Sequence, residues 1–313
     1  MQKLDVVTYG EAMALFIADE AGDLATVEKF IRRLAGAETN VAIGLARLGL
    51  SVGWVSRVGD DSFGRFVKHR VQQENVDCSC VTIDARYRTG MQLKARAENG
   101  ADPVIEYFRK GSAASHLSVD DFNEAYFLGA RHLHATGIAP ALSDTTMQFA
   151  HHALDFMRKN GKTISFDPNL RPTLWASEAV MKKHLNELAA KADWVLPGLS
   201  EGKILTGYST PHDIAGFYLD QGVKCVIIKL GAEGAYYRSA DEEGTVAGVP
   251  VAKVVDTVGA GDGFGVGVIS SLLEDRTLEQ AVARGNYIGA CAVQVVGDME
   301  GFPTRAELDA AIQ

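Results

Sequence analysis

Short apolar runs alternate with amphipathic stretches along most of the chain. Residues 4–9 (LDVVTY) and 51–58 (SVGWVSRV) are predicted to form buried strands that end at Gly10 and Gly59. Between them, residues 40–49 carry apolar side chains at helical spacing and finish on a glycine, which is typical of a helix with a C-terminal glycine cap. A strand, a helix and a strand in this order predict a parallel pair.

The same alternation continues toward the end of the sequence. Further strands are expected near residues 132, 163, 193 and 225, and helices over residues 143–160, from Gly261 onward and over 278–296. Repeated units of this kind predict an α/β fold with a doubly wound, mostly parallel sheet and helices on both faces. Ligands bind such sheets at the carboxyl ends of the strands.

Two segments, residues 11–35 and 84–110, break this alternation. They contain short alternating runs such as TGMQLKARA and PVIEYF, which are typical of antiparallel strands with one solvated face. We predict that the two segments form a small β-sheet lid on a core made of residues 1–10, 36–83 and 111–313. Because exposed strand edges need cover, we expect the lid to pair subunits in a homodimer or higher homo-oligomer.

Composition narrows the classes of function. The 313 residues, 47% hydrophobic and 23% charged, suffice for one large core with a small accessory domain. Forty acidic against 31 basic residues give a net charge of -9, which disfavours nucleic acid as a partner. No apolar run is long enough for a membrane span or a secretory signal. Four cysteines without metal or disulfide spacing predict a reducing, cytoplasmic setting.

The strongest local signal is the glycine-rich segment DTVGAGDGFGVGVISSLL, residues 256–273. Gly259, Ala260 and Gly261 leave the backbone bare just before an apolar helix, so their N–H groups can bind an anion. Asp262 then falls in the first turn, where a carboxylate either caps the helix or takes a proton from an attacking hydroxyl. The segment has no G-K-S/T of a P-loop and does not follow the first strand. Phosphoryl transfer is the favoured interpretation, with capping as the alternative.

Two segments resemble signatures of the ribokinase-like (PfkB) carbohydrate kinases. They are AGAETNVAIGLARLGLSVGWVSRVGD, residues 35–60, and DTVGAGDGFGVGVI, residues 256–269. The resemblance extends over essentially the whole chain. It implies a Rossmann-like core that binds ATP and a lid over the sugar. It also implies that Asp262 is the catalytic base and that Gly259, Ala260 and Gly261 form the anion hole.

The resemblance also implies cofactor positions. Glu201 matches a glutamate that organises Mg²⁺ through water, although a plain helix N-terminal glutamate remains the alternative. Asp256 matches a position that can hold a monovalent cation such as K⁺. The nucleotide is expected along Lys229, Gly231, Gly234, Gly259, Gly261, Asn286 and Ala290. Among these, the 231 and 234 positions also suit ordinary turn glycines, and the last two also suit a buried helix.

Within the family, the chain most resembles the kinases of 2-keto-3-deoxygluconate. The segments GEAMALF, YFRKGSAAS, FDPNLRPTLW and VLPGLSE carry this likeness. Arg109 and Arg171 are fork-shaped donors suited to a carboxylate. The expected substrate-binding set is Gly36, Asn40, Gln92, Tyr107, Arg109, Arg171 and Asp262. Alternatively, Arg109 is a solvated strand residue, Tyr107 packs on the lid, and Arg171 caps a helix or pairs with Asp167.

Fructokinases are the rival interpretation, because they share a D-P-N-x-R segment like residues 167–171. Their pattern has an aspartate for sugar hydroxyls where this sequence has Leu15. Because that carboxylate is absent here while Arg109 and Arg171 are present, the sequence favours an anionic sugar as the substrate. We therefore predict ATP-dependent phosphorylation of 2-dehydro-3-deoxy-D-gluconate to its 6-phosphate. A kinase for a neutral sugar, or a non-catalytic sugar or nucleotide sensor, is the alternative.

Overall fold

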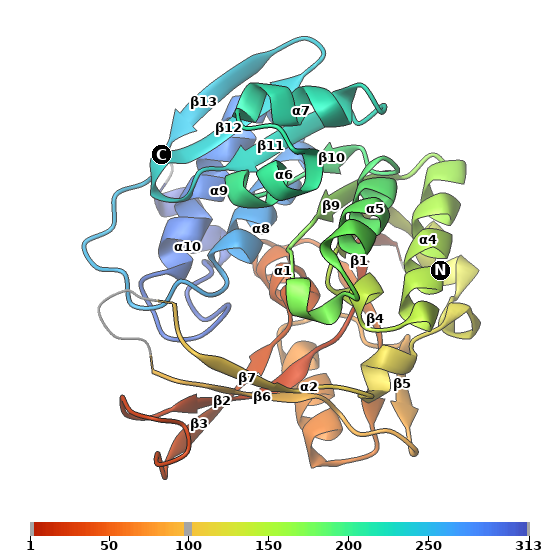
Figure 1. Cartoon of the computed structure of the whole chain (residues 1–313), viewed down its shortest axis with the longest axis vertical. Coiled ribbons are helices and arrows are strands. Elements are labelled where there is room, and N and C mark those ends of the chain that lie inside the picture. The colour runs from red at the N-terminus through yellow and green to blue at the C-terminus, as the bar shows by residue number, and fades with distance from the viewer. Residues whose placement is uncertain (1–2, 97–101, 312–313) are drawn as a thin grey trace.

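The computed structural model describes residues 3–96 and 102–311, and its strands form two sheets (Figure 1). In the large sheet the strand order is β13-β12-β11-β10-β9-β8-β1-β4-β5. In the small sheet it is β3-β2-β6-β7. The predicted α/β class, with a large sheet flanked by helices and a separate small sheet, is confirmed.

The large sheet is parallel from β5 to β11. The hairpin of β12 and β13 continues it in the antiparallel sense. Its strands are β1 (Leu4–Tyr9), β4 (Val52–Gly59), β5 (Val81–Asp84), β8 (Ala130–Thr136), β9 (Thr163–Asp167), β10 (Trp194–Val195), β11 (Cys225–Lys229), β12 (Gly234–Ser239) and β13 (Glu243–Ala247). The alternating βα pattern could not predict this last hairpin, because no helix separates its strands.

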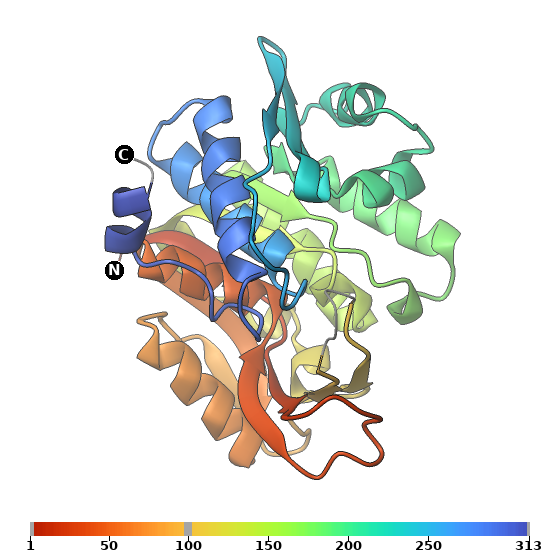
Figure 2. The same cartoon turned by 90° about the vertical axis from the view of Figure 1, so that its left-hand side faces the viewer.

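Helices cover both faces of the large sheet, as the view in Figure 2 shows. Successive residues on β1 point to opposite sides, so Val6 and Val7 belong to two different cores. The core around Val6 is covered by α1 (Ala37–Arg47), α2 (Ser62–Gln73), α8 (Ala260–Leu273), α9 (Leu278–Ala292) and α10 (Arg305–Ala311). The core around Val7 is covered by α3 (Glu124–Gly129), α4 (Asp144–Lys159), α5 (Glu178–Ala189), α6 (Leu199–Thr206) and α7 (Pro211–Leu219).

Helix termini largely follow the sequence signals. Helix α1 is followed by Gly49 with φ +87°, and α4 begins after Ser143, which accepts a hydrogen bond from the Thr146 N–H. Helix α9 ends at Ala292, earlier than the predicted 296. The Val293 carbonyl accepts a hydrogen bond from Val255 N, so the chain turns there to meet the segment before α8.

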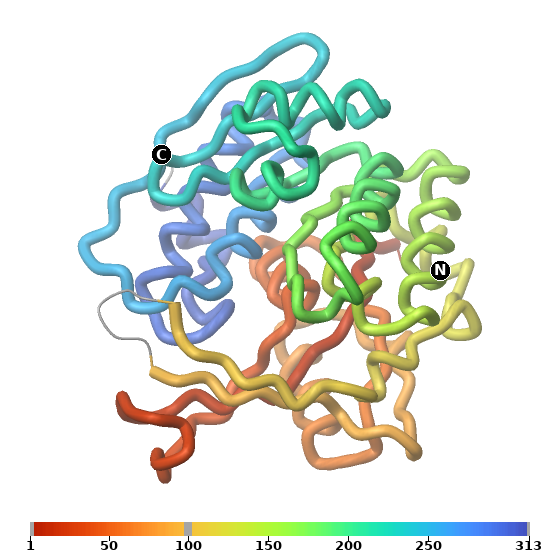
Figure 3. Tube along the Cα trace, viewed as in Figure 1, coloured from red at the N-terminus to blue at the C-terminus, as the bar shows by residue number. Residues whose placement is uncertain are grey.

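The small sheet consists of β2 (Met13–Ala18), β3 (Phe30–Ala35), β6 (Met91–Lys94) and β7 (Ile105–Phe108). The pairs β2–β3 and β6–β7 are antiparallel, as expected. The central pair β2–β6 is parallel, so the prediction of antiparallel strands was wrong there. β2 follows β1 and β6 follows β5, so both leave the same edge of a parallel sheet in the same direction. Figure 3 traces the two excursions side by side.

No helix among the described residues is both long and apolar enough to cross a bilayer.

Candidate active site

A cavity of about 400 Å³ lies where the small sheet meets the carboxyl ends of β9 and β11. Eleven of the residues predicted for the site line it: Gly36, Asn40, Gln92, Tyr107, Arg109, Arg171, Glu201, Lys229, Gly259, Gly261 and Asp262. The other six predicted residues are not among its lining residues: Ala260, Asp256, Gly231, Gly234, Asn286 and Ala290. The fold thus gathers residues from both sheets and from α1, α6 and α8.

The start of α8 can be built only with glycine at its first position. Gly259 is the N-cap with φ +83°, and a Cβ there would lie 1.7 Å from the Asp298 carbonyl oxygen. At Gly261 a Cβ would have room and would lie 3.6 Å from Lys229 Nζ. The first N–H groups of a helix have no partner inside it, so this end of α8 presents free donors. Such donors beside a lysine suit an anion.

Asp262 lies in the first turn of α8 and is held by two amides. Asn40 Nδ2 donates to its Oδ2 at 2.8 Å, and Asn169 Nδ2 lies 3.5 Å from its Oδ1. Burial is the main cause that raises the pKa of Asp262 to about 7, while the Asn40 hydrogen bond opposes the rise. Neighbouring Asp167 and Asp298 contribute to the rise, and Lys229 also opposes it. A carboxylate with a near-neutral pKa suits a general base.

Asp167 and Lys229 form an ion pair across the cavity wall. Lys229 Nζ lies 2.7 Å from Asp167 Oδ2, and each residue is the last of its strand. Burial alone would lower the pKa of Lys229, but the charges of Asp167 and Glu201 outweigh burial and raise it. Arg171, offered as an alternative partner of Asp167, instead donates through Nη1 to the Leu170 carbonyl at 2.9 Å. The ion-pair alternative for Arg171 is therefore not what the structure shows.

Glu201 combines two of the roles considered for it. Its Oε2 accepts a hydrogen bond from Gly198 N at 2.6 Å at the start of α6, which is the helix-terminal role. Its Oε1 accepts one from Leu170 N at 2.7 Å, and the residue also lines the cavity. Each carboxylate oxygen has a second lone pair, so the side chain can still bind water.

Arg109 is buried rather than solvated, with 8% exposure. Its Nε and Nη2 both lie 2.6 Å from Glu11 Oε2. The guanidinium has five N–H groups, so three remain after these two contacts. Arg109 lines the cavity, has three N–H groups that the Glu11 contacts do not use, and has its charge already matched by Glu11.

The small sheet contributes the far wall of the cavity. Gln92 is 3% exposed and pairs across β2–β6 with Leu15, whose side chain packs with Ile17. Tyr107 on β7 is 45% exposed and lines the cavity, which differs from the alternative of a fully packed lid residue. Gly36 approaches this sheet closely, since a Cβ there would lie 2.7 Å from the Glu11 carbonyl oxygen.

The predicted residues outside the cavity lining have local structural partners. Asn286 Nδ2 donates to the Val246 and Ala247 carbonyls and so joins α9 to β13. Ala290 lies on α9, one turn further on. At Gly234 a Cβ would meet the Val246 carbonyl oxygen at 2.0 Å, and Gly231 has φ +65°. Their role beside a nucleotide stays a prediction.

The sequence reasoning did not place every lining residue in the site; among those it left out are Asp167, Asn169 and Asp298. Asp167 and Asn169 had a signal, because a D-P-N run directly after a buried strand places polar side chains at the ligand edge of the sheet. Asn169 has φ +40°, a conformation that asparagine tolerates better than most residues. Asp298 follows an apolar run and has no motif that points to it.

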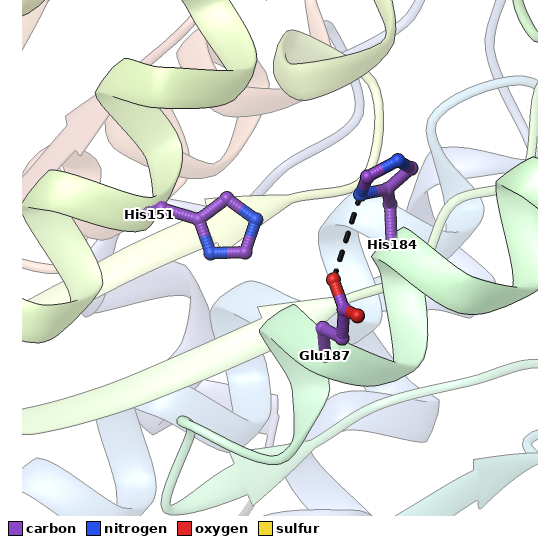
Figure 4. Close-up of side chains that lie close together, drawn as sticks. All are labelled: His151, His184 and Glu187. Atoms are coloured by element: carbon purple, nitrogen blue, oxygen red, sulfur yellow. Dashed lines mark ion pairs between the residues drawn. The ribbon is translucent and has the colours of Figure 1, made fainter.

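A separate group of possible metal ligands comprises His151 on α4 and His184 and Glu187 on α5 (Figure 4), none of which lines the cavity. Ligand atoms of His151, His184 and Glu187 lie within 4.8 Å of one another. However, Lys191 Nζ lies 3.0 Å from His151 Nδ1 and 2.8 Å from Asp155 Oδ2. An ammonium in that position competes with a metal ion for the same nitrogen.

The site lies at the ligand edge of a doubly wound sheet. It combines a helix start that depends on glycine with a carboxyl whose pKa is near 7, and both are features that suit phosphoryl transfer. Residues 3–305 match the pfkB family of carbohydrate kinases, and the chain belongs to this family. It is therefore a carbohydrate kinase. The chain is 51% identical to a Bacillus subtilis (strain 168) 2-dehydro-3-deoxygluconokinase, over 98% of this chain and 94% of that protein.

Solved structures agree with this assignment. A PfkB protein from Polaromonas sp. JS666 superposes with a TM-score of 0.91 at 55% identity, covering 98% of this chain and 99% of that one. A protein named ribokinase II from E. coli, solved with ATP and Mg²⁺, also superposes with a TM-score of 0.91. It is 30% identical and covers 100% of this chain and 99% of its own.

Proposed function

We propose that this kinase transfers the γ-phosphoryl group of ATP to the terminal hydroxyl of 2-dehydro-3-deoxy-D-gluconate, giving the 6-phosphate. The observation that carries the proposal is the near-neutral carboxyl of Asp262 at the glycine-built start of α8, in one cavity with Arg171. The activity named for the Bacillus subtilis relative, at 51% identity, supports the choice of sugar acid.

Asp262 is the proposed base. The acceptor oxygen forms a bond to the γ-phosphorus, the bond from that phosphorus to the β-phosphate oxygen breaks, and ADP leaves. The proton of the hydroxyl passes to Asp262, which Asn40 keeps oriented through its 2.8 Å hydrogen bond. The free N–H donors at residues 259–261 would stabilise charge on the moving phosphoryl group.

ATP and Mg²⁺ are the proposed cofactors, and the donor set of the cavity fits them. Mg²⁺ prefers oxygen ligands and keeps several waters, which suits the oxygens of Asp167, Asn169 and Glu201. When bound, the ion would neutralise phosphate charge. The ATP and Mg²⁺ complex of the E. coli neighbour supports this assignment. The nucleotide is proposed to lie along Lys229 and the 231–234 turn, toward Asn286 and Ala290.

Arg171 and Arg109 are proposed to bind the carboxylate of the sugar acid. Arg171 is the stronger candidate, because Arg109 already shares its charge with Glu11. The buried, apolar Leu15 beside Gln92 offers no carboxylate for a neutral sugar. This observation favours the acid over fructose.

The small sheet is proposed to be the lid and also the surface that joins subunits. Its edge strands carry exposed apolar side chains: Ile31 on β3 is 41% exposed and Phe108 on β7 is 54% exposed. Covering them with a second copy of the chain would complete both edges. A cytoplasmic setting is proposed as well, in keeping with the four free cysteines.

A substrate panel tests the proposed function. ADP release should be measured with MgATP and 2-dehydro-3-deoxy-D-gluconate, gluconate, fructose and ribose. We expect the highest kcat/KM for the keto acid, and a fructose value at least about tenfold higher would overturn the assignment.

Arg171→Ala sharpens this test. The variant should raise KM for the acid by about tenfold or more, because a charge-assisted hydrogen bond is lost, while KM for ATP stays unchanged. Arg171→Lys is the matched control that keeps the charge without the fork. An unchanged KM for the acid in Arg171→Ala would reassign this arginine.

A further inference from the structure

A buried lysine of the small sheet joins two aspartates of the core. Lys94 is the last residue of β6 and its side chain is 1% exposed. Its Nζ lies 2.6 Å from Asp256 Oδ2 and 3.2 Å from Asp298 Oδ1. Asp256 belongs to the segment between β13 and α8, and Asp298 to the segment after α9. One ammonium therefore holds three distant parts of the chain together.

The two aspartates support the turn that begins α8. Asp256 Oδ1 accepts a hydrogen bond from Val258 N, and its Oδ2 accepts one from Gly297 N, both at 3.2 Å. The Asp298 carbonyl oxygen packs so closely on Gly259 that a Cβ there would lie only 1.7 Å away. The ammonium of Lys94 therefore lies directly beneath the turn that presents the N–H donors of residues 259–261.

The space between the carboxylates of Asp256 and Asp298 needs a positive charge. Burial is the main cause that raises the pKa of Asp298 to about 6; Lys94 opposes this rise, and Asp256 contributes to it. Without a cation, two buried carboxylates would face each other below the phosphate end of the cavity, and burying unpaired charge is costly. The chain supplies that cation itself.

This arrangement disagrees with the K⁺ expected at Asp256. Oδ2 of that carboxylate already contacts the ammonium and the Gly297 N–H, and Oδ1 already accepts the Val258 N–H. An ammonium carries the same charge as K⁺, so a second cation at this carboxylate would be repelled. The residues present do not fit a bound K⁺.

We propose that Lys94 is a built-in monovalent cation, which positions the start of α8 from the small sheet and makes phosphoryl transfer independent of K⁺. Because the ammonium belongs to β6, the small sheet contributes directly to the support of the anion-binding turn. Gln92, two residues earlier on the same face of β6, lines the cavity, so one strand contacts both the substrate space and the supports of α8. Lys94 is a positioning residue and touches neither substrate. The proposal rests on the kinase activity proposed above.

The proposal predicts how wild type and Lys94→Ala respond to cations. In choline chloride or KCl at equal ionic strength, wild-type kcat should differ by no more than about twofold. Lys94→Ala should lose about tenfold to a hundredfold in kcat in choline, as supporting residues of a charged site do. KCl or NH₄Cl should restore much of that loss, because the vacated space can take a free cation.

Two matched variants separate charge from packing. Lys94→Met fills the space without a charge, so its loss should not be restored by KCl. Lys110→Ala removes an exposed lysine of the neighbouring strand end and should behave as wild type. Rescue of the methionine variant to the same extent as the alanine variant would overturn the proposal.

Melting temperature gives a readout that needs no sugar. KCl should raise the Tm of Lys94→Ala above its value in choline chloride, and should leave wild type unchanged. This arm reports on Lys94 even if the substrate panel rejects the sugar acid, so the two proposals can fail separately. A wild-type enzyme whose Tm and kcat both rise strongly with KCl, with Lys94→Ala responding equally, would show that the lysine does not act as the cation.

Discussion

Two aspartates on either side of the Gly259 turn meet opposite environments. Asp262, inside α8, is held by the neutral amide of Asn40, and burial raises its pKa to about 7. Asp256, before the helix, contacts the ammonium of Lys94 at 2.6 Å and accepts two backbone N–H groups. The same residue type is thus a candidate proton acceptor on one side of the turn, and on the other side it is held in a network of ionic and backbone contacts.

The two carboxylates contact different groups, and this difference separates their roles. For Asp262, burial raises the pKa more than the neutral Asn40 donor lowers it, so this carboxyl can take up a proton near neutral pH. For Asp256, an ammonium and two backbone N–H groups match the charge of the carboxylate in a network of contacts that supports the turn. The two positions can therefore be separated by equivalent substitutions.

Asp262→Asn should give the largest effect. Removal of the base should lower kcat by about 10²–10⁴, while affinity for ATP stays close to wild type. Steady-state ADP release and a binding titration with ATP measure the two quantities. A variant that keeps a tenth of the wild-type kcat would remove Asp262 from the role of base.

Asp256→Asn should act mainly on stability. Removing one partner of a buried ion pair should lower the free energy of unfolding by about 3 kcal/mol, measured by urea denaturation near pH 8. Asp309→Asn, at an exposed position, is the control and should change little. Equal stability of Asp256→Asn and wild type would contradict the structural role.

In the same urea denaturation experiment, Asp262→Asn should increase the free energy of unfolding, whereas Asp256→Asn should decrease it. The folded-state pKa of Asp262, about 7, lies above the ordinary aspartate value. The folded protein therefore holds an extra proton between these two values, and its stability falls as the pH rises through that window. Asparagine removes this loss, so the variant should be more stable than wild type at pH 8, and the gain should shrink toward pH 4. A gain that is independent of pH would exclude the raised pKa.

Much of the fold follows from local signals. Central strands of the large sheet such as β1 and β11 are apolar runs, and residues such as Ser143 and Gly49 mark helix boundaries. The hairpin β12–β13 and the parallel contact of β2 with β6 were not predicted, since strand order and direction depend on pairing between distant segments.

In the candidate site, too, residues that follow from a local sequence pattern were predicted, and contacts between distant segments were not. The glycine-rich run leads to Gly259, Gly261 and Asp262, because backbone freedom and a helix start are written in neighbouring residues. Lys94 and Asp298 are 204 positions apart, and no local pattern predicts their contact. A hint was nonetheless present: Lys94 shares the face of β6 with Gln92, so the strand period alone places it toward the core.

The pH dependence of kcat/KM for the sugar acid, at saturating MgATP, tests the central claim most directly. For wild type we expect activity to fall about tenfold per pH unit below about pH 7, because protonated Asp262 cannot accept the hydroxyl proton. In Asn40→Ala this fall in activity should begin at a higher pH, because the Asn40 hydrogen bond lowers the pKa of Asp262. Ionisation of ATP is common to both enzymes, so their difference isolates the protein group. Superimposable profiles for the two enzymes, or a wild-type profile that stays flat to about pH 5, would contradict the assignment of Asp262 as the base.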